Sequence, residues 1–477
     1  MCQVAPVALV LMIAATVAGW PAAAAAEPPD TVGNATAEPA EIPASTESET
    51  TADGAFVETE PETVALTEEE APLAKQSFSE KFSTLTDAAR GLMVWDLFDG
   101  RLTVRSHARL MIDGTTGWGD DRFDDSFGVI EDGIDVRRVS LFAQGTIDHH
   151  IRYSVSFDFG ADAGYGEAFI EGREEGLSVF GYRIGQFRLG FFQEPFTFER
   201  VESSYYSSFV ERSLPIWTFS PGSNLGYMLF DQAFNERLHW SVGFFSFGQG
   251  NEANSSDSTL SVSTRVTGLP VYRDDGRRLL HVGASFSTRN PKGGTVHYRA
   301  RPEARFVDAL VDTGDFTAGR IQLFGLEVVA MNGPLHIQSE AVVSAVQQTE
   351  FGDLRLWGAY VEAGWFITGE QRSYDKALGT FSRMVPTRHY SGGLKGLFAR
   401  QKGGAVEVVG RVSTVDLNDG ELRGGEMTDV SLGLNWYLNP TSLVKLNYIN
   451  SSVRDRGRAN IVVLRYQYRP LPVPGWR

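Results

Sequence analysis

The chain has 477 residues but a single cysteine, Cys2, close to its N-terminus. A disulfide framework and a thiolate metal site are therefore excluded. Beyond residue 26, no stretch approaches the roughly 20 apolar residues that a membrane-spanning helix requires. The sequence also contains no Gly-x-Ser-x-Gly elbow, no phosphate-cradling glycine loop and no His-Glu-x-x-His pair. We therefore expect no catalytic residue, no metal ion and no cofactor.

The first 26 residues differ from the rest of the chain. Residues 4–19 form an apolar run too short to span a membrane comfortably, and small residues lead up to Ala26. This pattern predicts a secretory signal peptide over residues 1–26. Residues 1–10 contain no Lys or Arg, so the amino terminus supplies the only positive charge there. An N-terminal membrane anchor is the alternative.

Residues 27–90 are strongly acidic. They contain 15 Asp and Glu against three basic residues, which gives -12 of the total net charge of -17 and leaves -5 for residues 91–477. Pro, Thr, Ala and Glu dominate, and aromatics are scarce. A segment of this composition cannot bury enough apolar surface to offset its ordering entropy. We predict that residues 27–90 form a disordered periplasmic segment and residues 91–477 form the folded domain.

The folded domain is rich in segments that alternate apolar and polar residues. In residues 151–159, Ile, Tyr, Val, Phe and Phe share one face, and Arg, Ser, Ser and Asp share the other. Residues 429–438, 445–449 and 462–468 repeat this pattern. Successive side chains of a strand point to opposite faces, so each segment has an apolar face and a wet face. Repeated alternating segments of about ten residues are typical of a transmembrane β-barrel.

This pattern predicts an all-β, antiparallel barrel of about 16 strands. The expected strands are 101–113, 134–147, 150–160, 166–175, 178–189, 223–231, 237–248, 259–267, 278–288, 319–331, 334–347, 353–366, 403–415, 427–438, 441–453 and 459–469. Short turns at 149–150, 332–333 and 439–440 alternate with long connections at 190–222, 289–318 and 367–402, which we interpret as outer loops. Residues 389–400 are assigned to a loop, because another strand would make the count odd.

Strand parity also predicts which arginines face the lumen. Arg138 shares its face with Ser140 and Gln144, and Arg152 shares its face with the serines and Asp158 of its strand. Arg137 has lipid-side parity, so we expect it at the exposed rim or in a bulge. A guanidinium group is a planar, permanently charged donor suited to anions. The alternative, especially for Arg152 near Asp158, is a structural cross-strut between an arginine and a carboxylate.

Several short motifs occur in a particular order. They are Arg137-Arg138, Gly185-Gln-Phe-Arg, Pro195-Phe-Thr-Phe-Glu-Arg200, Glu211-Arg-Ser-Leu-Pro215, Phe366-Ile-Thr-Gly-Glu370 and Leu432-Gly-Leu-Asn-Trp-Tyr437. In this set the chain resembles the phosphate-selective porin O and P family over roughly residues 92–469. The resemblance implies a 16-stranded, trimeric channel of the outer membrane with a basic constriction.

The resemblance also implies anion-binding roles for particular arginines. They are Arg137, Arg138, Arg152, Arg200, Arg212, Arg299, Arg301 and Arg305, the last three as a ladder on a loop folded into the pore. Two departures from the family pattern affect these expectations. The family's phosphate-contacting aspartate would fall at Gly166, beside Glu167. Its terminal Phe would fall at Pro470, so Tyr468 or Trp476 would have to replace that assembly signal.

We therefore expect a passive porin in the outer membrane that prefers anions such as phosphate. Its expected partners are outer-membrane lipid, small anions and two further copies of itself, with no nucleic acid. A general or sugar-type porin on the same barrel is the first alternative. An outer-membrane barrel enzyme and an envelope anchor are alternatives of another class.

Overall fold

The computed structural model describes residues 94–160, 164–172, 177–179, 182–248, 258–291, 294–348, 352–390 and 403–469. The predicted signal peptide, the acidic segment 27–90, the C-terminal residues from Pro470 onward and most of 389–400 lie outside the described residues. None of the described helices is long and apolar enough to cross a membrane.

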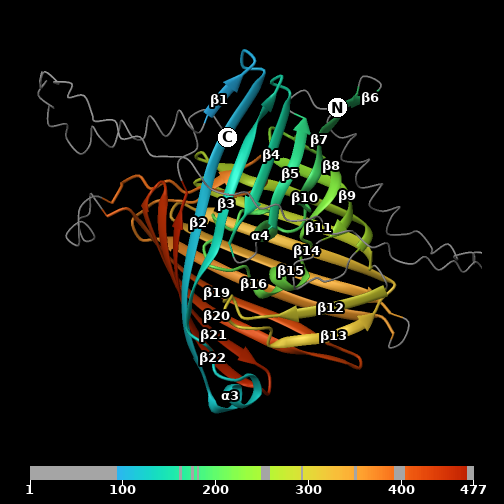
Figure 1. The fold of residues 1–477 in the computed structure, drawn as a ribbon, viewed down its shortest axis with the longest axis vertical. Helices are drawn as coiled ribbons and strands as arrows, with labels where there is room; N and C mark the ends of the chain where they lie inside the picture. The colour runs from blue at the N-terminus through green and yellow to red at the C-terminus, as the bar shows by residue number, and fades with distance from the viewer. Residues whose placement is uncertain are drawn as a thin grey trace, which may run out of the picture.

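Within the described residues, sixteen antiparallel strands form a closed barrel (Figure 1). Each strand pairs with the next, and the last pairs with the first from Leu110↔Tyr468 to Gly119↔Ala459. The predicted fold is confirmed. The strands are β2 (Leu102–Gly119), β3 (Gly133–Ile147), β4 (Ile151–Asp158), β5 (Gly164–Gly172), β7 (Tyr182–Gln193), β8 (Ser223–Ala233), β9 (Leu238–Gly248), β10 (Ser258–Arg273), β11 (Arg278–Pro291), β14 (Arg320–Asn332), β15 (Leu335–Gln347), β16 (Leu354–Phe366), β19 (Ala405–Asp419), β20 (Leu422–Asn439), β21 (Ser442–Val453) and β22 (Gly457–Tyr468).

The alternation of side chains explains why these segments form a barrel wall. In β15, Ile337 and Val343 are exposed on the outer face, whereas His336 and Glu340 are buried on the inner face. Closing the sheet satisfies the backbone hydrogen bonds of every strand within the wall, which a lipid environment requires. The outer face is therefore apolar, and the polar side chains point into the lumen.

The barrel has two distinct ends, which Figure 1 shows at the top and bottom. At the first, the terminal end, β2 begins and β22 ends. Two short strands extend the wall there: β1 (Val94–Leu97) pairs with β2, and β6 (Leu177–Val179) pairs with β7. At the opposite end, the loop end, helix α3 (Asp121–Phe127) begins after Asp120, whose side chain accepts a hydrogen bond from the backbone N–H of Phe123.

Three long connections fold into the lumen. The constriction loop, residues 194–222, and the second loop, described over residues 294–319, enter from the loop end, as predicted. The third, described over residues 367–390, follows β16 and therefore enters from the terminal end, together with the short turns. The interpretation of 367–402 as an outer loop is therefore wrong. Loop length alone does not reveal the side of the barrel, whereas counting strands does.

Each inward segment contains short regular elements. The constriction loop carries α4 (Phe198–Val201) and α5 (Leu214–Phe219), the second loop carries the hairpin β12 (Thr295–Ala300) and β13 (Val311–Thr317), and the third carries the hairpin β17 (Ser373–Asp375) and β18 (Thr380–Ser382). These elements position the side chains of the pore.

An apolar core lies between the inward loops and one side of the wall. Phe196 and Phe219 of the constriction loop and Tyr298 of β12 are fully buried against Leu323 of β14 and Leu356 of β16. Burying one such side chain stabilises the fold by about 1.5–3 kcal/mol. The loops are therefore part of the folded structure and occupy the side of the lumen nearest β14–β22.

Candidate pore constriction

The open part of the lumen runs along the opposite side of the wall, β2–β8. There, inward-facing arginines are partly exposed: the side chain of Arg152 is 27% exposed and that of Arg188 is 13% exposed. On the β10–β22 side, inward-facing arginines such as Arg265 and Arg411 are almost completely buried. The partly exposed wall is the one that a solute in the lumen would contact.

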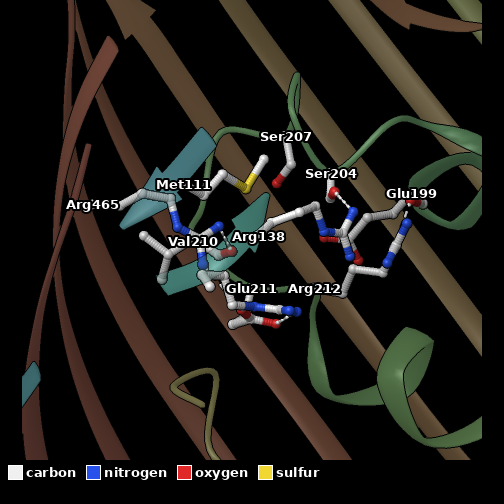
Figure 2. A pocket seen from close by; sticks show the side chains of 10 residues that line it. Met111, Arg138, Glu199, Ser204, Ser207, Val210, Glu211, Arg212 and Arg465 are labelled. Carbon is white, nitrogen blue, oxygen red and sulfur yellow. Dashed lines mark hydrogen bonds and ion pairs between the residues drawn. The ribbon is translucent and has the colours of Figure 1, made fainter. Parts of the chain in front are cut away.

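A small hollow that opens to solvent lies where the constriction loop crosses β2 and β3 (Figure 2). Arginines and carboxylates alternate around it. It is lined by Met111, Arg137, Arg138, Glu199, Ser204, Ser207, Val210, Glu211, Arg212 and Arg465. The predicted Arg137, Arg138 and Arg212 therefore come together at one place, although they come from β3 and from a loop more than 50 residues away along the chain.

Arg137 is not the exposed rim residue that its parity predicts. Its side chain is buried, and its Nε donates to Glu211 Oε1 at 2.9 Å. The cause is a bulge opposite β2, where Met111 pairs with Arg138 but Asp113 pairs with Asp135. The extra residue turns Arg137 inward beside Arg138. We expected Arg137 either at the exposed rim or in a bulge. The structure places it in a bulge, so the prediction of an exposed rim position is wrong.

Glu211 connects two sides of the hollow. Arg465 of β22 binds both oxygens of Asp113, at 2.7 and 2.6 Å, and also contacts Glu211 Oε1 at 3.1 Å. Burial by itself would raise the pKa of Glu211, but the guanidinium groups of Arg137 and Arg465 hold it well below its usual range. Glu211 therefore stays negative and neutralises part of the arginine charge.

Arg138 and Arg152 both face the lumen, and both contact carboxylates. Arg138 Nε lies 2.9 Å from Asp158 Oδ2, and its Nη1 donates to Ser204 Oγ at 3.1 Å. Arg152 contacts Glu171 at 2.7 Å. Asp158, which we expected to pair with Arg152, instead forms an ion pair with Arg138.

Arg200 and Arg212 lie on the constriction loop itself. Arg200, in α4, is only 5% exposed. Arg212 is half-exposed, and its Nε and Nη2 donate to the backbone carbonyls of Glu199, Arg200 and Glu202 at 3.3–3.4 Å. Among the described residues, no carboxylate oxygen lies within 4 Å of the Arg212 guanidinium. Backbone carbonyls thus orient this group, and the carboxylates of Glu199, Glu202 and Glu211 act on it only from beyond 4 Å.

The three arginines of the second loop do not line the hollow. Arg299 is on β12, opposite Asp312 of β13, and Arg305 Nε lies 3.8 Å from Asp135 Oδ2. Arg301 stacks over the ring of Trp217 of α5 at 4.2 Å. They lie on the second loop, which enters the barrel from the loop end.

Buried arginines of the wall hold the loops in place. Arg411 of β19 donates to Glu199 of the constriction loop at 3.1 Å and to Glu303 of the second loop at 2.6 Å. From the third segment, Arg372 binds Glu202 at 2.6 Å and Ser208 at 2.7 Å. The constriction loop is therefore fixed from the wall and from the terminal end.

A second lumenal group, which we call the terminal track, was not expected from the sequence: the three arginines Arg105, Arg109 and Arg469, with His107 between the first two. Arg105, His107 and Arg109 are alternate residues of β2, so strand parity places them all on the lumenal face, as the pairings of β2 with β3 confirm. His107 stacks on Phe142 at 4.5 Å, and Arg109 lies over the same ring at 4.2 Å. The alternation in residues 102–113 could have revealed this group.

Residues 111–469 match the family described as phosphate-selective porin O and P. The chain belongs to this family. It is a porin of the outer membrane, and its family and fold are those of a channel rather than of an enzyme.

This porin is 21% identical over 387 residues to porin O of Pseudomonas aeruginosa, which covers 73% of this chain and 85% of porin O. It is 27% identical over 333 residues to an uncharacterised protein of Caulobacter vibrioides, which covers 66% of this chain but only 62% of that protein. Two solved structures are similar in fold. The anion-selective porin from Comamonas acidovorans has 10% identity and a TM-score of 0.47, and the match covers 77% of this chain and all of that one. OmpT of Vibrio cholerae has 13% identity and a TM-score of 0.46, and the match covers 79% of this chain and all of that one.

Gly166, where the resemblance leads us to expect the family's phosphate-contacting aspartate, lies in β5. A Cβ atom at residue 166 would lie 2.5 Å from Ser156 Oγ, and Ser156 in turn accepts a hydrogen bond from the backbone N–H of Glu167 at 2.8 Å. A register shift in β4 and β5 accompanies this contact. A side chain at residue 166 would displace the Ser156 hydroxyl from this hydrogen bond, and Glu167 supplies a carboxylate next to Arg109, Arg152 and Arg188.

Proposed function

We propose that this porin is a passive channel that prefers small anions, with phosphate as the favoured class, and that Arg138, Arg200 and Arg212 form its selective constriction. The observation that carries the proposal is Arg212. Its guanidinium borders the hollow, is oriented by three backbone carbonyls and has no carboxylate within 4 Å among the described residues. Rings of Arg or Lys select anions in pores.

The surroundings of the hollow suit an oxyanion. Arg138 directs its guanidinium toward the hollow beside the Ser204 hydroxyl, and Figure 2 shows both next to Arg212. A phosphate ion has several acceptor oxygens, and two guanidinium forks with a hydroxyl provide matching donors. The arginines of the second loop, Arg299, Arg301 and Arg305, would attract anions toward this point, and Arg152 would act beyond it.

A weakly selective general porin is the second candidate, because a specific observation favours it. Arg137, Arg138 and Arg152 each contact a carboxylate within 3 Å. Paired charges attract a passing anion less than isolated ones do. The two candidates differ in how many arginines besides Arg212 contribute to selectivity.

Purified porin in a planar bilayer, under a salt gradient, separates the two candidates. An anion-preferring channel shifts its reversal potential toward the chloride equilibrium potential, and added inorganic phosphate blocks its chloride current. A general porin reverses near zero and shows no phosphate block. Both the reversal potential and the phosphate block are measured on the full-length chain.

The predicted export and assembly remain part of the proposal. A signal peptide over residues 1–26 would deliver the chain to the outer membrane, whose lipid the apolar outer face fits, and the porin would assemble as a homotrimer. N-terminal sequencing of the mature protein tests the cleavage near Ala26. Chemical cross-linking in the membrane tests the trimer.

A further inference from the structure

The terminal track leads from the terminal end toward the constriction, and its two inner arginines, Arg109 and Arg469, form no ion pair among the described residues. Arg109 and Arg469 flank the ring of Tyr205 at 5.7 and 5.8 Å from its centre. Neither guanidinium has a carboxylate oxygen within 4 Å in the described part of the chain, and the Nε atoms of both are buried without a hydrogen-bond partner there. The phenol of Tyr206 and, more weakly, the carboxyl group of Glu167 act on Arg109 from a distance.

A second small hollow, which also opens to solvent, lies beside this track. It is lined by Tyr205, Tyr206, Arg383, Met384, Tyr437, Asn439, Pro440, Thr441, Ser442 and Leu443, a set that includes one cation and no carboxylate. The turn between β20 and β21 belongs to it, so it lies at the terminal end. The Tyr205 hydroxyl is buried there with no hydrogen-bond partner among the described residues. The track and the hollow together form a cationic, donor-rich surface.

The chain itself supplies an anionic segment next to this surface. The described chain begins at Val94, which pairs with Arg105, the first residue of the track. Residues 27–90, with a net charge of -12, are therefore attached directly beside it. The six glutamates of residues 58–70 are 24 to 36 residues from Val94, and 24 residues span at most about 80 Å. Arg109 lies four positions after Arg105 in β2, which places it about 14 Å further along the strand.

We propose that the acidic segment 27–90 binds the terminal track as a tethered anion and thereby competes with anions that leave or enter the pore at this end. Attachment beside Arg105 gives the segment a local concentration in the mM range or above. The competition depends on charge, so it weakens as the Debye length falls from about 10 Å at 0.1 M salt to about 3 Å at 1 M. The inference rests on the anion preference proposed above.

The test compares the full chain with a full-length variant in which Glu58, Glu60, Glu62, Glu68, Glu69 and Glu70 are all changed to Gln. If the segment occupies the track half of the time, the variant conducts about twofold more chloride current at about 0.1 M salt. The two channels converge at about 1 M salt. A variant lacking residues 27–85 should behave like the Gln variant. Equal currents at low salt for all three channels would overturn the proposal.

A peptide of residues 57–70 provides the complementary experiment. Added to the terminal-end chamber, it should block the channel that lacks residues 27–85, and the same peptide with Gln for Glu should not. Changing both Arg109 and Arg469 to Gln should weaken the block by about tenfold or more, as expected for the loss of about 1.4 kcal/mol. An unchanged block would overturn the assignment to the track.

The reversal potential of the channel that lacks residues 27–85 separates this inference from the proposed function. If that channel is anion-selective but its current is insensitive to segment and peptide, only the inference fails. If that channel has no anion preference, the proposed function fails, whatever the segment does.

Discussion

Changing Arg212 to Gln is the sharpest test of the constriction. The substitution removes one positive charge and leaves a shorter, neutral polar side chain in place of the group that donates to the backbone carbonyls of the constriction loop. A unit charge 4 Å from an anion contributes about 1 kcal/mol in bulk water and about 4 kcal/mol at an effective dielectric of 20. The hollow is narrow but connected to solvent, so the effect lies between these limits.

These energies convert into binding. At about 1.4 kcal/mol for each factor of ten, the concentration of phosphate that half-blocks chloride current should rise by at least about fivefold in R212Q. R212E should go further, because it places a carboxylate where the anion passes, and its reversal potential should shift toward cations. R212K keeps the charge but loses the planar fork, so we expect an intermediate phosphate block.

The control is Arg454→Gln. It removes the same charge from a side chain that is 72% exposed at the loop end and contacts Glu426. R454Q should leave the phosphate block and the reversal potential within error of the unsubstituted channel. If R212Q and R212E also leave both quantities unchanged, Arg212 is not at the selective point and the constriction lies elsewhere.

Three further predictions concern the surroundings of the constriction. Burial raises the pKa of Glu202 to about 8, so this carboxyl group loses its proton and becomes negative as the pH rises through that value. The anion preference of the channel, measured as its reversal potential, should therefore fall between about pH 7 and pH 9. The E202Q channel should not show this change. Arg411→Met leaves Glu303 buried without its cation and should destabilise the loops by about 3–5 kcal/mol, measured as faster proteolysis of the inward loops while the heat-modifiable gel migration of the barrel persists. Changing Arg299 and Arg301 to Ala should lower the conductance at low salt while leaving the phosphate block unchanged, because both residues lie outside the hollow; a weakened block would place them within the site.

The strands were predictable because the apolar character of their outer face can be recognised from the residues of each strand alone. A strand in contact with lipid needs an apolar residue at every second position, so β15 and β21 are visible from their own residues. All sixteen expected strands are present, although β10 and β20 extend several residues beyond the predicted bounds. The inward loops were predictable from their length, but the end from which 367–390 enters was not.

The charge partners in the lumen were not predictable, because they come from distant parts of the chain. Arg465 binds Asp113 across 352 residues, and Arg411 binds Glu199 across 212. Arg137 reaches the lumen only through a bulge, which parity does not reveal. Arg138 and Arg152 could be placed on the lumenal face from the sequence, but whether each is paired or free depends on which carboxylates fold beside it.

The arrangement of the inward loops has a consequence for biogenesis. The constriction loop is held by Arg411 from the wall and by Arg372 from a segment that arrives later in the chain and from the other end of the barrel. Neither contact can form until residues 170 or 212 positions apart have been brought together. A barrel that has closed but has not yet docked these loops would be a wide, unselective hole. Until the loops dock, such a barrel would let solutes cross the outer membrane unselectively. The contacts of Arg372 and Arg411 hold the constriction loop in the position that narrows the pore.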